Sequence, residues 1–333
     1  MGTIILMIDS HGRHIRYLRL SVTDRCDLRC HYCLPARAKF ARNDRLLSID
    51  ELDRLASAFI RLGVKKLRIT GGEPLVRRGV DELIARLGRH RRSGALDELT
   101  LTTNGTQLEK HAAGLAAAGI ERINVSLDHF DPAEYARITR GGNLSKVLAG
   151  IEAAQLHGIK VKLNAVALRQ DNFENAADLV AFAHERDMSI SFIEVMPIGE
   201  IGADRSVQHV PMPAVRDAIE QRFPLTDTAM RTGGPARYAR TQAGGVVGFI
   251  TPLTANFCDG CNRVRVSAEG KMFACLGHDV ATDLKAPLRA SADDASLDAA
   301  ILDLIAIKPA RHEFDVAKGS AAAVQRPMAA TGG

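Results

Sequence analysis

The sequence has no predominantly apolar stretch long enough to span a bilayer, so an ordinary transmembrane helix is not expected. Its short apolar run at residues 4–8 follows no basic segment, so a secretory signal is not expected either. Lys and Arg outnumber Asp and Glu by only 44 to 39, an excess that fits an anionic small ligand better than a nucleic-acid scaffold. We therefore expect a cytoplasmic protein that binds neither nucleic acid nor a membrane.

Cysteine is also scarce, with six residues in the chain of 333. In a reducing cytosol, cysteines persist for metal binding or catalysis more often than for disulfides. All six stand in two tight groups: Cys26, Cys30 and Cys33 form the first, and Cys258, Cys261 and Cys275 form the second. No cysteine is left over.

The composition, 46% hydrophobic and 25% charged, excludes collagen-like, coiled-coil and disordered chains, and the length allows two domains or one large α/β barrel. From residue 17 to about residue 195, short β-branched runs alternate with longer helical patterns, which is typical of βα units around a parallel sheet. One helix is predicted after Ser48, because Glu51 completes a capping box and Gly63 ends the pattern. The six predicted strands are Tyr17–Val22, Lys66–Thr70, Glu98–Thr102, Arg122–Ser126, Lys160–Val166 and Ile190–Val195.

After Met196 this alternation gives way to a polar stretch rich in Gly and Pro, which indicates a change of module. Arg237–Thr241 and Val246–Thr251 flank a short Gly-rich turn and predict a β-hairpin. The small residues from Ala321 to Gly333 are typical of a flexible end. We expect a barrel domain at residues 14–235 and a C-terminal module at residues 236–333.

The first cysteine group, with the spacing Cys-x3-Cys-x2-Cys, directly follows the first predicted strand. Three thiolates on one loop can hold three irons of a cubane cluster and leave the fourth iron for an outside ligand. A structural zinc site would need a fourth ligand, for which His31 is the candidate. The spacing is uncommon among zinc sites, and the carboxyl end of a barrel strand favours an active site, so we favour the cluster.

The second cysteine group also has only three members. Zinc would again need a fourth ligand, which His278 could supply; the alternative is a second cluster with an open iron at which substrate could dock. Arg263 and Arg265 alternate along a predicted strand beside this group, so both point to one face. Exposed strand arginines are usually solvated surface, but beside an open cluster they favour a polyphosphate ligand. No glycine-rich Walker loop is present to bind phosphate instead.

The first cysteine spacing, with Tyr32 just before the last cysteine, resembles the signature of radical S-adenosylmethionine enzymes. The Thr-Gly-Gly-Glu-Pro segment at residues 70–74 is similar to that superfamily's second motif. From about Asp9 to its last residue, the chain resembles the GTP 3′,8-cyclase family of molybdenum cofactor biosynthesis. Seven blocks support this resemblance: residues 17–26, 68–74, 101–105, 124–128 and 192–196, the second cysteine group, and the terminal pair Gly332 and Gly333.

The resemblance implies an α/β fold, an incomplete parallel (β/α)6 TIM-like barrel closed by a smaller C-terminal α+β module. It implies a lyase that uses two 4Fe-4S clusters and S-adenosylmethionine to convert GTP into (8S)-3′,8-cyclo-7,8-dihydroguanosine 5′-triphosphate. In that reaction a 5′-deoxyadenosyl radical removes the 3′ hydrogen of GTP, and the sugar radical attacks C8 of guanine. The implied partners are an electron donor, a second copy in a homodimer, and a downstream cyclic pyranopterin monophosphate synthase.

The resemblance also implies roles for individual residues. The six cysteines would hold the two clusters, and the contacts for S-adenosylmethionine would be Tyr32, Gly72, Ser126 and Met196. The contacts for GTP would be Arg19, Arg68, Thr102, Lys162, Arg263, Val264 and Arg265, while Gly332 and Gly333 would act in catalysis by threading between cofactor and substrate. The chain departs from the family at Ser191, where relatives often have an arginine aimed at the triphosphate, and at Thr331, where an aliphatic residue is usual.

Two other functions fit the same residues. One is a different radical enzyme with an auxiliary cluster, such as a peptide modifier, although those enzymes often ligate that cluster with four cysteines. The other is a zinc-stabilised binding protein without catalysis, which iron and sulfide analysis would distinguish.

Overall fold

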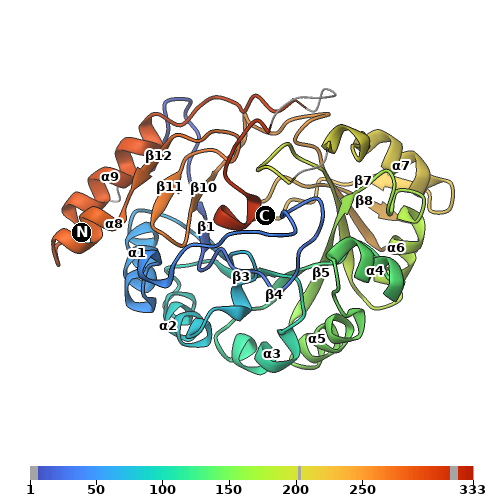
Figure 1. Ribbon diagram of the computed structural model, residues 1–333, viewed down its shortest axis with the longest axis horizontal. Coiled ribbons are helices and arrows are strands. Elements are labelled where there is room, and N and C mark those ends of the chain that lie inside the picture. The colour runs from blue at the N-terminus through green and yellow to red at the C-terminus, as the bar shows by residue number, and fades with distance from the viewer. Residues whose placement is uncertain (1–6, 202–203, 316–321, 333) are drawn as a thin grey trace.

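The computed structural model describes residues 7–201, 204–315 and 322–332, and it shows a curled sheet with helices along its outer face (Figure 1). The six strands predicted for the barrel are confirmed, with ends that differ by at most one residue from the predicted bounds. They are β1 (Tyr17–Ser21), β2 (Lys66–Thr70), β3 (Glu98–Thr103), β4 (Arg122–Ser126), β5 (Lys160–Ala167) and β6 (Ser189–Glu194). Each pairs in parallel with the next, as a βα barrel requires.

Helices follow these strands and cover the outside of the sheet. The predicted capping box is confirmed, because the Ser48 side chain accepts from the Glu51 N–H while the Glu51 carboxylate accepts from the Ser48 N–H. The helix that it begins ends just before Gly63, whose φ is +111°. The barrel helices are α1 (Ile49–Arg61), α2 (Val80–Arg92), α3 (Leu108–Ala117), α4 (Pro132–Thr139), α5 (Leu144–Leu156) and α6 (Ala176–His184), and the later helices are α7 (Met212–Glu220), α8 (Lys285–Ala290), α9 (Ala295–Ala306) and α10 (Met328–Thr331).

The C-terminal part of the chain extends both edges of the barrel sheet. Its strands are β7 (Leu225–Asp227), β8 (Arg237–Thr241), β9 (Val246–Ile250), β10 (Arg263–Val266), β11 (Lys271–Phe273) and β12 (Ala281–Asp283). The predicted hairpin is confirmed as the antiparallel pair β8–β9, and β9 pairs in parallel with β6. At the other edge, β10 pairs in parallel with β1.

The resulting strand order is β12-β11-β10-β1-β2-β3-β4-β5-β6-β9-β8-β7, so the sheet curls without closing on itself. This confirms the incomplete barrel with an added C-terminal module. Because one sheet joins both parts, the boundary expected at residue 235 stays a prediction. Among the described residues, no helix is both long and apolar enough to cross a membrane.

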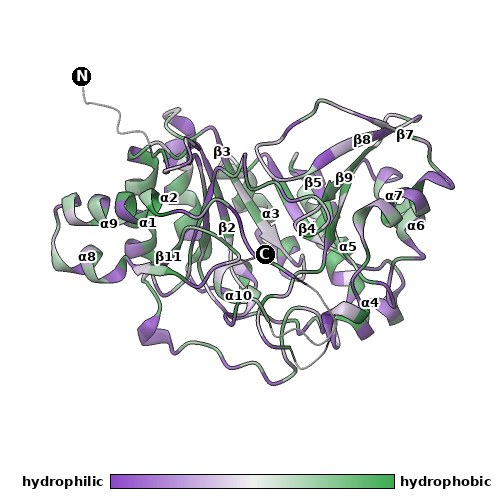
Figure 2. Cartoon of the chain, turned by 90° about the horizontal axis from the view of Figure 1, so that it is seen from above, coloured by the Kyte–Doolittle hydropathy of each residue, from purple (hydrophilic) through white to green (hydrophobic). Residues whose placement is uncertain are grey.

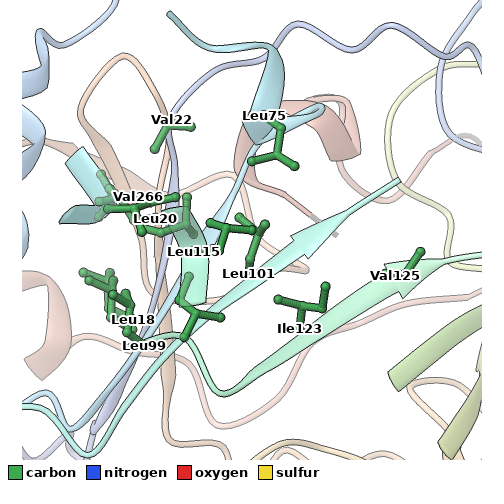
Figure 3. Packing of buried hydrophobic residues seen from close by; sticks show 14 of the residues in the cluster. Leu18, Leu20, Val22, Leu75, Leu99, Leu101, Leu115, Ile123, Val125 and Val266 are labelled. Carbon is green, nitrogen blue, oxygen red and sulfur yellow. The ribbon is translucent and has the colours of Figure 1, made fainter. Parts of the chain in front are cut away.

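The two faces of the barrel strands carry different chemistry. Leu18 and Leu20 of β1 and Leu99 and Leu101 of β3 belong to one hydrophobic cluster on the side that faces the helices, and these side chains are fully buried (Figure 3). The helices turn their apolar faces toward the same layer (Figure 2). Since side chains alternate along a strand, the residues between these leucines point into the barrel, and Arg19 is one of them. The interior of the barrel is therefore polar and open to a ligand.

The C-terminal segment at residues 322–332 lies across the mouth of the barrel, and its end is near the centre in both views (Figures 1 and 2). Ala329 and Thr331 of α10 are buried, at 4% and 0% exposure. For these described residues the expected flexible end is wrong, because tertiary contacts outweigh the weak packing capacity of small side chains. Gly333 lies outside the described residues.

Candidate active site

Two adjoining cavities occupy the interior of the barrel. The first cavity contains the first cysteine group at the carboxyl ends of the strands, and the second cavity contains the second cysteine group. Four residues line both cavities: Thr102, Asn164, Ile193 and Met196. A molecule in one cavity can therefore touch a molecule in the other.

The first cysteine loop is held against the segment that follows β2. The Gly72 N–H donates to the Thr23 carbonyl over 2.8 Å, and the Glu73 N–H donates to the Arg25 carbonyl over 2.8 Å. A Cβ added to Gly72 would lie 2.4 Å from the Arg25 carbonyl oxygen, so only glycine permits this approach. The Gly72 N–H is used in this contact, and the Gly72 carbonyl oxygen is the backbone group that can accept from the amine of a ligand.

Tyr32 forms part of the wall of the first cavity, and Asp128 fixes its orientation. The Tyr32 hydroxyl donates to Asp128 Oδ2 over 2.6 Å, while the Val166 N–H donates to Asp128 Oδ1 over 2.9 Å. Burial raises the pKa of Asp128 to about 6, although these hydrogen bonds oppose the rise. The sequence motif at residues 124–128 contained Asp128, but its role became evident only from the contact with Tyr32.

The two cysteine groups lie in opposite electrostatic surroundings. Burial, together with the nearby carboxylates of Glu73 and Asp27, raises the pKa of Cys26 to about 12. Burial also acts on Cys261, but the positive charges of Arg263 and Lys308 outweigh it and lower its pKa to about 7. Cys261 therefore favours the thiolate more strongly than Cys26, although burial raises the pKa of Cys258 in the same group.

The cysteines fit polynuclear clusters better than single zinc ions. Each group of three thiols lines one cavity. Among the described residues, however, no three His, Cys, Asp or Glu side chains are arranged to hold one metal ion. In a cubane cluster each thiolate binds a separate iron, so the thiols need not meet at one point. The candidate fourth zinc ligands are also engaged elsewhere, because His31 Nε2 lies 3.0 Å from Asp171 Oδ2 and His278 Nε2 lies 3.0 Å from the Arg311 carbonyl.

The second cavity is strongly cationic. On neighbouring strands, Arg19 is the direct partner of both Arg68 and Arg265. Burial lowers the pKa of Arg19 to about 10, and repulsion from Arg68 and Arg263 contributes. Eight Arg and Lys residues line this cavity, whereas none of the described residues that line it is Asp or Glu: Arg19, Lys66, Arg68, Arg122, Lys162, Arg263, Arg265 and Lys308. Glu98 forms ion pairs with Lys66 and Arg122, but the remaining like charges repel one another, so this cavity favours a polyanionic ligand.

Hydrogen bonds hold several of these cations in place. Arg68 Nε donates to the Tyr17 hydroxyl over 2.5 Å, and Arg68 Nη1 donates to Thr102 Oγ1 over 2.9 Å. Lys162 Nζ donates to the Tyr238 hydroxyl over 2.8 Å. Burial lowers the pKa of Lys162 to about 7, helped by the charges of Arg68 and Arg122. The amount of positive charge in the cavity therefore changes near neutral pH.

The fold gathers most of the predicted site residues into these cavities. The first cavity contains Cys26, Cys30, Cys33, Tyr32, Gly72, Ser126 and Met196, and the second contains Arg19, Arg68, Thr102, Lys162, Arg263, Arg265, Cys258, Cys261 and Cys275. The side chain of Val264 instead lies in the hydrophobic core, since it alternates with its two arginine neighbours. Ser191 is fully buried and lines neither cavity. Gly332 is near the second cavity, because its carbonyl accepts from Arg265 Nη1 over 2.6 Å.

Some lining residues were not singled out from the sequence. Lys66 and Arg122 lie on the same strand faces as Arg68 and Asn124, so alternation along the predicted strands could have identified them. Tyr238 and Lys308 come from distant segments, and no local pattern marks them.

Comparisons with known proteins agree with this geometry. Residues 20–183 match the model of the radical SAM superfamily, and residues 188–314 match the model named Molybdenum Cofactor Synthesis C. The chain is 53% identical over 328 residues to the GTP 3′,8-cyclase of Nitrobacter winogradskyi, covering 98% of this chain and 96% of the relative. It is 54% identical over 329 residues to the GTP 3′,8-cyclase of Bradyrhizobium diazoefficiens, again covering 98% and 96%.

Among solved structures, Streptococcus suis SuiB bound to S-adenosylmethionine is similar in fold. The TM-score is 0.62 at 17% sequence identity, covering 96% of this chain and 78% of SuiB. At this identity the likeness concerns the fold alone.

Proposed function

The chain belongs to the GTP 3′,8-cyclase family of radical S-adenosylmethionine enzymes, and from this premise we propose how its residues divide the work. It is a lyase that cyclises GTP to (8S)-3′,8-cyclo-7,8-dihydroguanosine 5′-triphosphate in molybdenum cofactor biosynthesis. Of the structural features, the pairing of a cysteine-lined cavity with an adjoining cavity of eight cations supports this function most directly.

Cys26, Cys30 and Cys33 would hold a 4Fe-4S cluster in the first cavity. With S-adenosylmethionine bound, this cluster would supply the radical chemistry that removes the 3′ hydrogen of GTP. The three thiols of Cys258, Cys261 and Cys275 support a second cluster, which would leave one iron open toward the second cavity.

S-adenosylmethionine would occupy the first cavity. The Gly72 carbonyl would accept from its amine, while Tyr32, held by Asp128, would form the wall beside its adenine. Ser126, at the end of β4, and Met196, two residues after β6, line the same cavity from strands that β5 separates. These side chains orient the cofactor toward the second cavity, which Met196 also lines.

GTP would occupy the second cavity with its triphosphate among the eight cations. Arg19, Arg263 and Arg265 offer guanidinium donors that suit phosphate oxygens, and Lys162 adds an ammonium. Thr102 lines both cavities, which supports a contact with the part of GTP that would lie beside the cofactor. Met328 and Ala329 cover part of the first cavity and would exclude water from the reaction.

An electron donor, a homodimeric state and transfer of the product to cyclic pyranopterin monophosphate synthase are predictions that follow from family membership.

The function can be tested by incubating the anaerobically reconstituted protein with GTP, S-adenosylmethionine and a strong reductant. The expected product is the cyclised nucleotide, identified by mass and by its 3′–C8 bond, with ATP as the control nucleotide. Iron and sulfide analysis of the same sample should give two 4Fe-4S clusters. Zinc without iron, or 5′-deoxyadenosine without any modified nucleotide, would contradict the proposed function.

Substitution Arg263→Ala is expected to weaken binding of GTP more than binding of guanosine. A charged hydrogen bond to phosphate contributes ~1.5–3 kcal/mol, so the dissociation constant for GTP should rise about ten- to a hundredfold. Calorimetry with both ligands measures the difference. Arg237→Ala provides a control at an exposed arginine of β8. Equal binding of GTP by Arg263→Ala and the parent would place Arg263 outside the phosphate site.

GTP binding is expected to weaken about tenfold as the pH rises from 6.5 to 8.5, because the pKa of Lys162 in the ligand-free protein is about 7. Above pH 7 the Lys162 side chain is mainly neutral in the ligand-free protein. It must therefore take up a proton to pair with a bound anion. Ionisation of Tyr17 would also weaken GTP binding at higher pH, because it adds a negative charge to the cavity. Burial opposes this ionisation, but the positive charges of Arg68, Arg19 and Lys66 lower the pKa of Tyr17 to about 7. Calorimetry in buffers of different ionisation enthalpy measures the uptake.

The nucleotide's own ionisation is common to all variants, so the comparison between variants isolates Lys162. Lys162→Gln should reduce both the proton uptake and the pH dependence, whereas Lys160→Gln, two residues away and exposed, should change neither. The same proton uptake in Lys162→Gln and the parent would exclude Lys162 as its source.

A further inference from the structure

The C-terminal segment passes between two loops that belong to the two cavities. On one side, Val324 forms a parallel bridge with Ile198, the Gly199 N–H donates to the Val324 carbonyl over 2.7 Å, and the Ala323 N–H donates to the Pro197 carbonyl over 3.0 Å. Residues 197–199 directly follow Met196, which lines both cavities. This side of the segment is therefore attached to the first cavity.

On its other side, the segment is attached by the side chain of Arg326 to the loop after Cys275. Arg326 Nη1 donates to the His278 carbonyl over 2.7 Å and to Asp279 Oδ1 over 2.6 Å. Arg326 Nη2 donates to the carbonyls of Cys275 and Leu276. The guanidinium also lies 4.2 Å from the centre of the Phe273 ring, and its side chain is only 10% exposed.

The remaining residues of the segment reach from this attachment into the barrel. Met328 and Ala329 line the first cavity, and the Gly332 carbonyl accepts from Arg265. Residues 327–332 thus connect Arg326, which is attached to the loop after Cys275, with the interior that would hold both cofactor and substrate. A displacement of Arg326 would also displace Met328 and Ala329, because Pro327 and the short helix α10 restrict the backbone angles between these residues.

We propose that Arg326 is a positioning residue that fixes the C-terminal segment to the Cys275 loop, so that closure of the first cavity by Met328–Gly332 depends on a correctly formed second cysteine site. This inference rests on the proposed function of the two cysteine groups. A lysine at this position would keep the charge but lose the planar fork that reaches three carbonyls and a carboxylate. The fork, and not the charge alone, would then determine where the segment lies.

The test compares the parent, Arg326→Lys and Cys275→Ala by hydrogen exchange of the backbone after iron–sulfur reconstitution. The amides of Ala330 and Gly332 donate to the carbonyls of Pro327 and Met328, so their exchange reports whether α10 is in place. Both variants should exchange about tenfold faster at residues 328–332. In Arg326→Lys, the iron content and the exchange of β10 and β11 should match the parent, and 5′-deoxyadenosine should be released severalfold in excess over cyclised nucleotide.

Arg311→Lys is the matched control, because Arg311 is an exposed arginine of the same C-terminal part. Unchanged exchange at residues 328–332 in Arg326→Lys would overturn the proposal. Faster exchange that extends through β10 and β11 with loss of iron would also overturn it, since Arg326 would then only stabilise the module. If the parent made no cyclised nucleotide, the proposed function would fail, and the exchange comparison would still decide the role of Arg326.

Discussion

Replacing Cys30 by alanine is expected to abolish cleavage of S-adenosylmethionine, with a loss on the order of a thousandfold or more. The three thiols of the first group each bind one iron of the proposed cluster, so removal of one leaves the cofactor without its anchor. The measurement is the release of 5′-deoxyadenosine and methionine under anaerobic reduction. Binding of GTP should change little, because Cys30 lines the first cavity and not the cationic one.

Cys261→Ala is the matched variant in the second group. Cys261 lies beside Arg263, with Arg263 Nη2 3.8 Å from its sulfur, and it lines the cationic cavity. This variant should retain part of the cleavage activity but form no cyclised nucleotide, because the substrate would no longer be oriented. If cleavage is lost equally in both variants while the first cluster is intact, this division of labour is wrong.

Removing the terminal pair Gly332 and Gly333 is expected to suppress the cyclised product while both clusters and GTP binding remain nearly intact. Gly332→Ala should produce a similar loss, on the order of a hundredfold, by displacing groups that must be positioned closely. Gly332 has a φ of +72°, and an added Cβ would lie 2.1 Å from Thr70 Oγ1. The segment must therefore move away from the wall of the first cavity to accept any side chain.

Turnover, iron content and GTP affinity of the deletion and of Gly332→Ala should be compared with those of Gly94→Ala. Gly94 also has a positive φ, +74°, but an added Cβ would meet nothing within 4 Å. This control has the same backbone strain without the collision, and it should keep normal turnover. Undiminished turnover in the deletion variant would mean that the tail has no part in the reaction.

These two predictions differ in the interactions that they test. The first depends on covalent chemistry that cysteine alone provides. The second depends on the position of a segment that the Arg265 guanidinium holds through one carbonyl, and to which Arg326 makes an independent attachment. The tail also shares Arg265 with the proposed phosphate site, so we expect the tail to affect how GTP is oriented more than how tightly it binds.

The sequence by itself determined the features that depend on residue spacing. Short β-branched runs between helical patterns located all six barrel strands to within one residue. The alternation of side chains along a strand placed Arg263 and Arg265 on one face. The spacing of the cysteines and the Gly-Gly-Glu-Pro turn indicated the superfamily. The capping box at Ser48 predicted the start of α1 because its hydrogen bonds join residues only three positions apart.

Only the tertiary structure decided which distant residues meet. Arg19 acquires Arg265 as a neighbour because β10 adds to the edge of β1, and no local pattern specifies that pairing or its register. The same holds for the Tyr32–Asp128 contact, for Lys308 in the second cavity and for Arg326 against the Cys275 loop. The resemblance implied that Val264 contacts GTP together with Arg263 and Arg265. Because side chains alternate along β10, the Val264 side chain instead lies in the hydrophobic core. The small residues near the C-terminus are another example. Their position depends on packing against segments far along the chain, and the conformational propensities of neighbouring residues do not specify such packing.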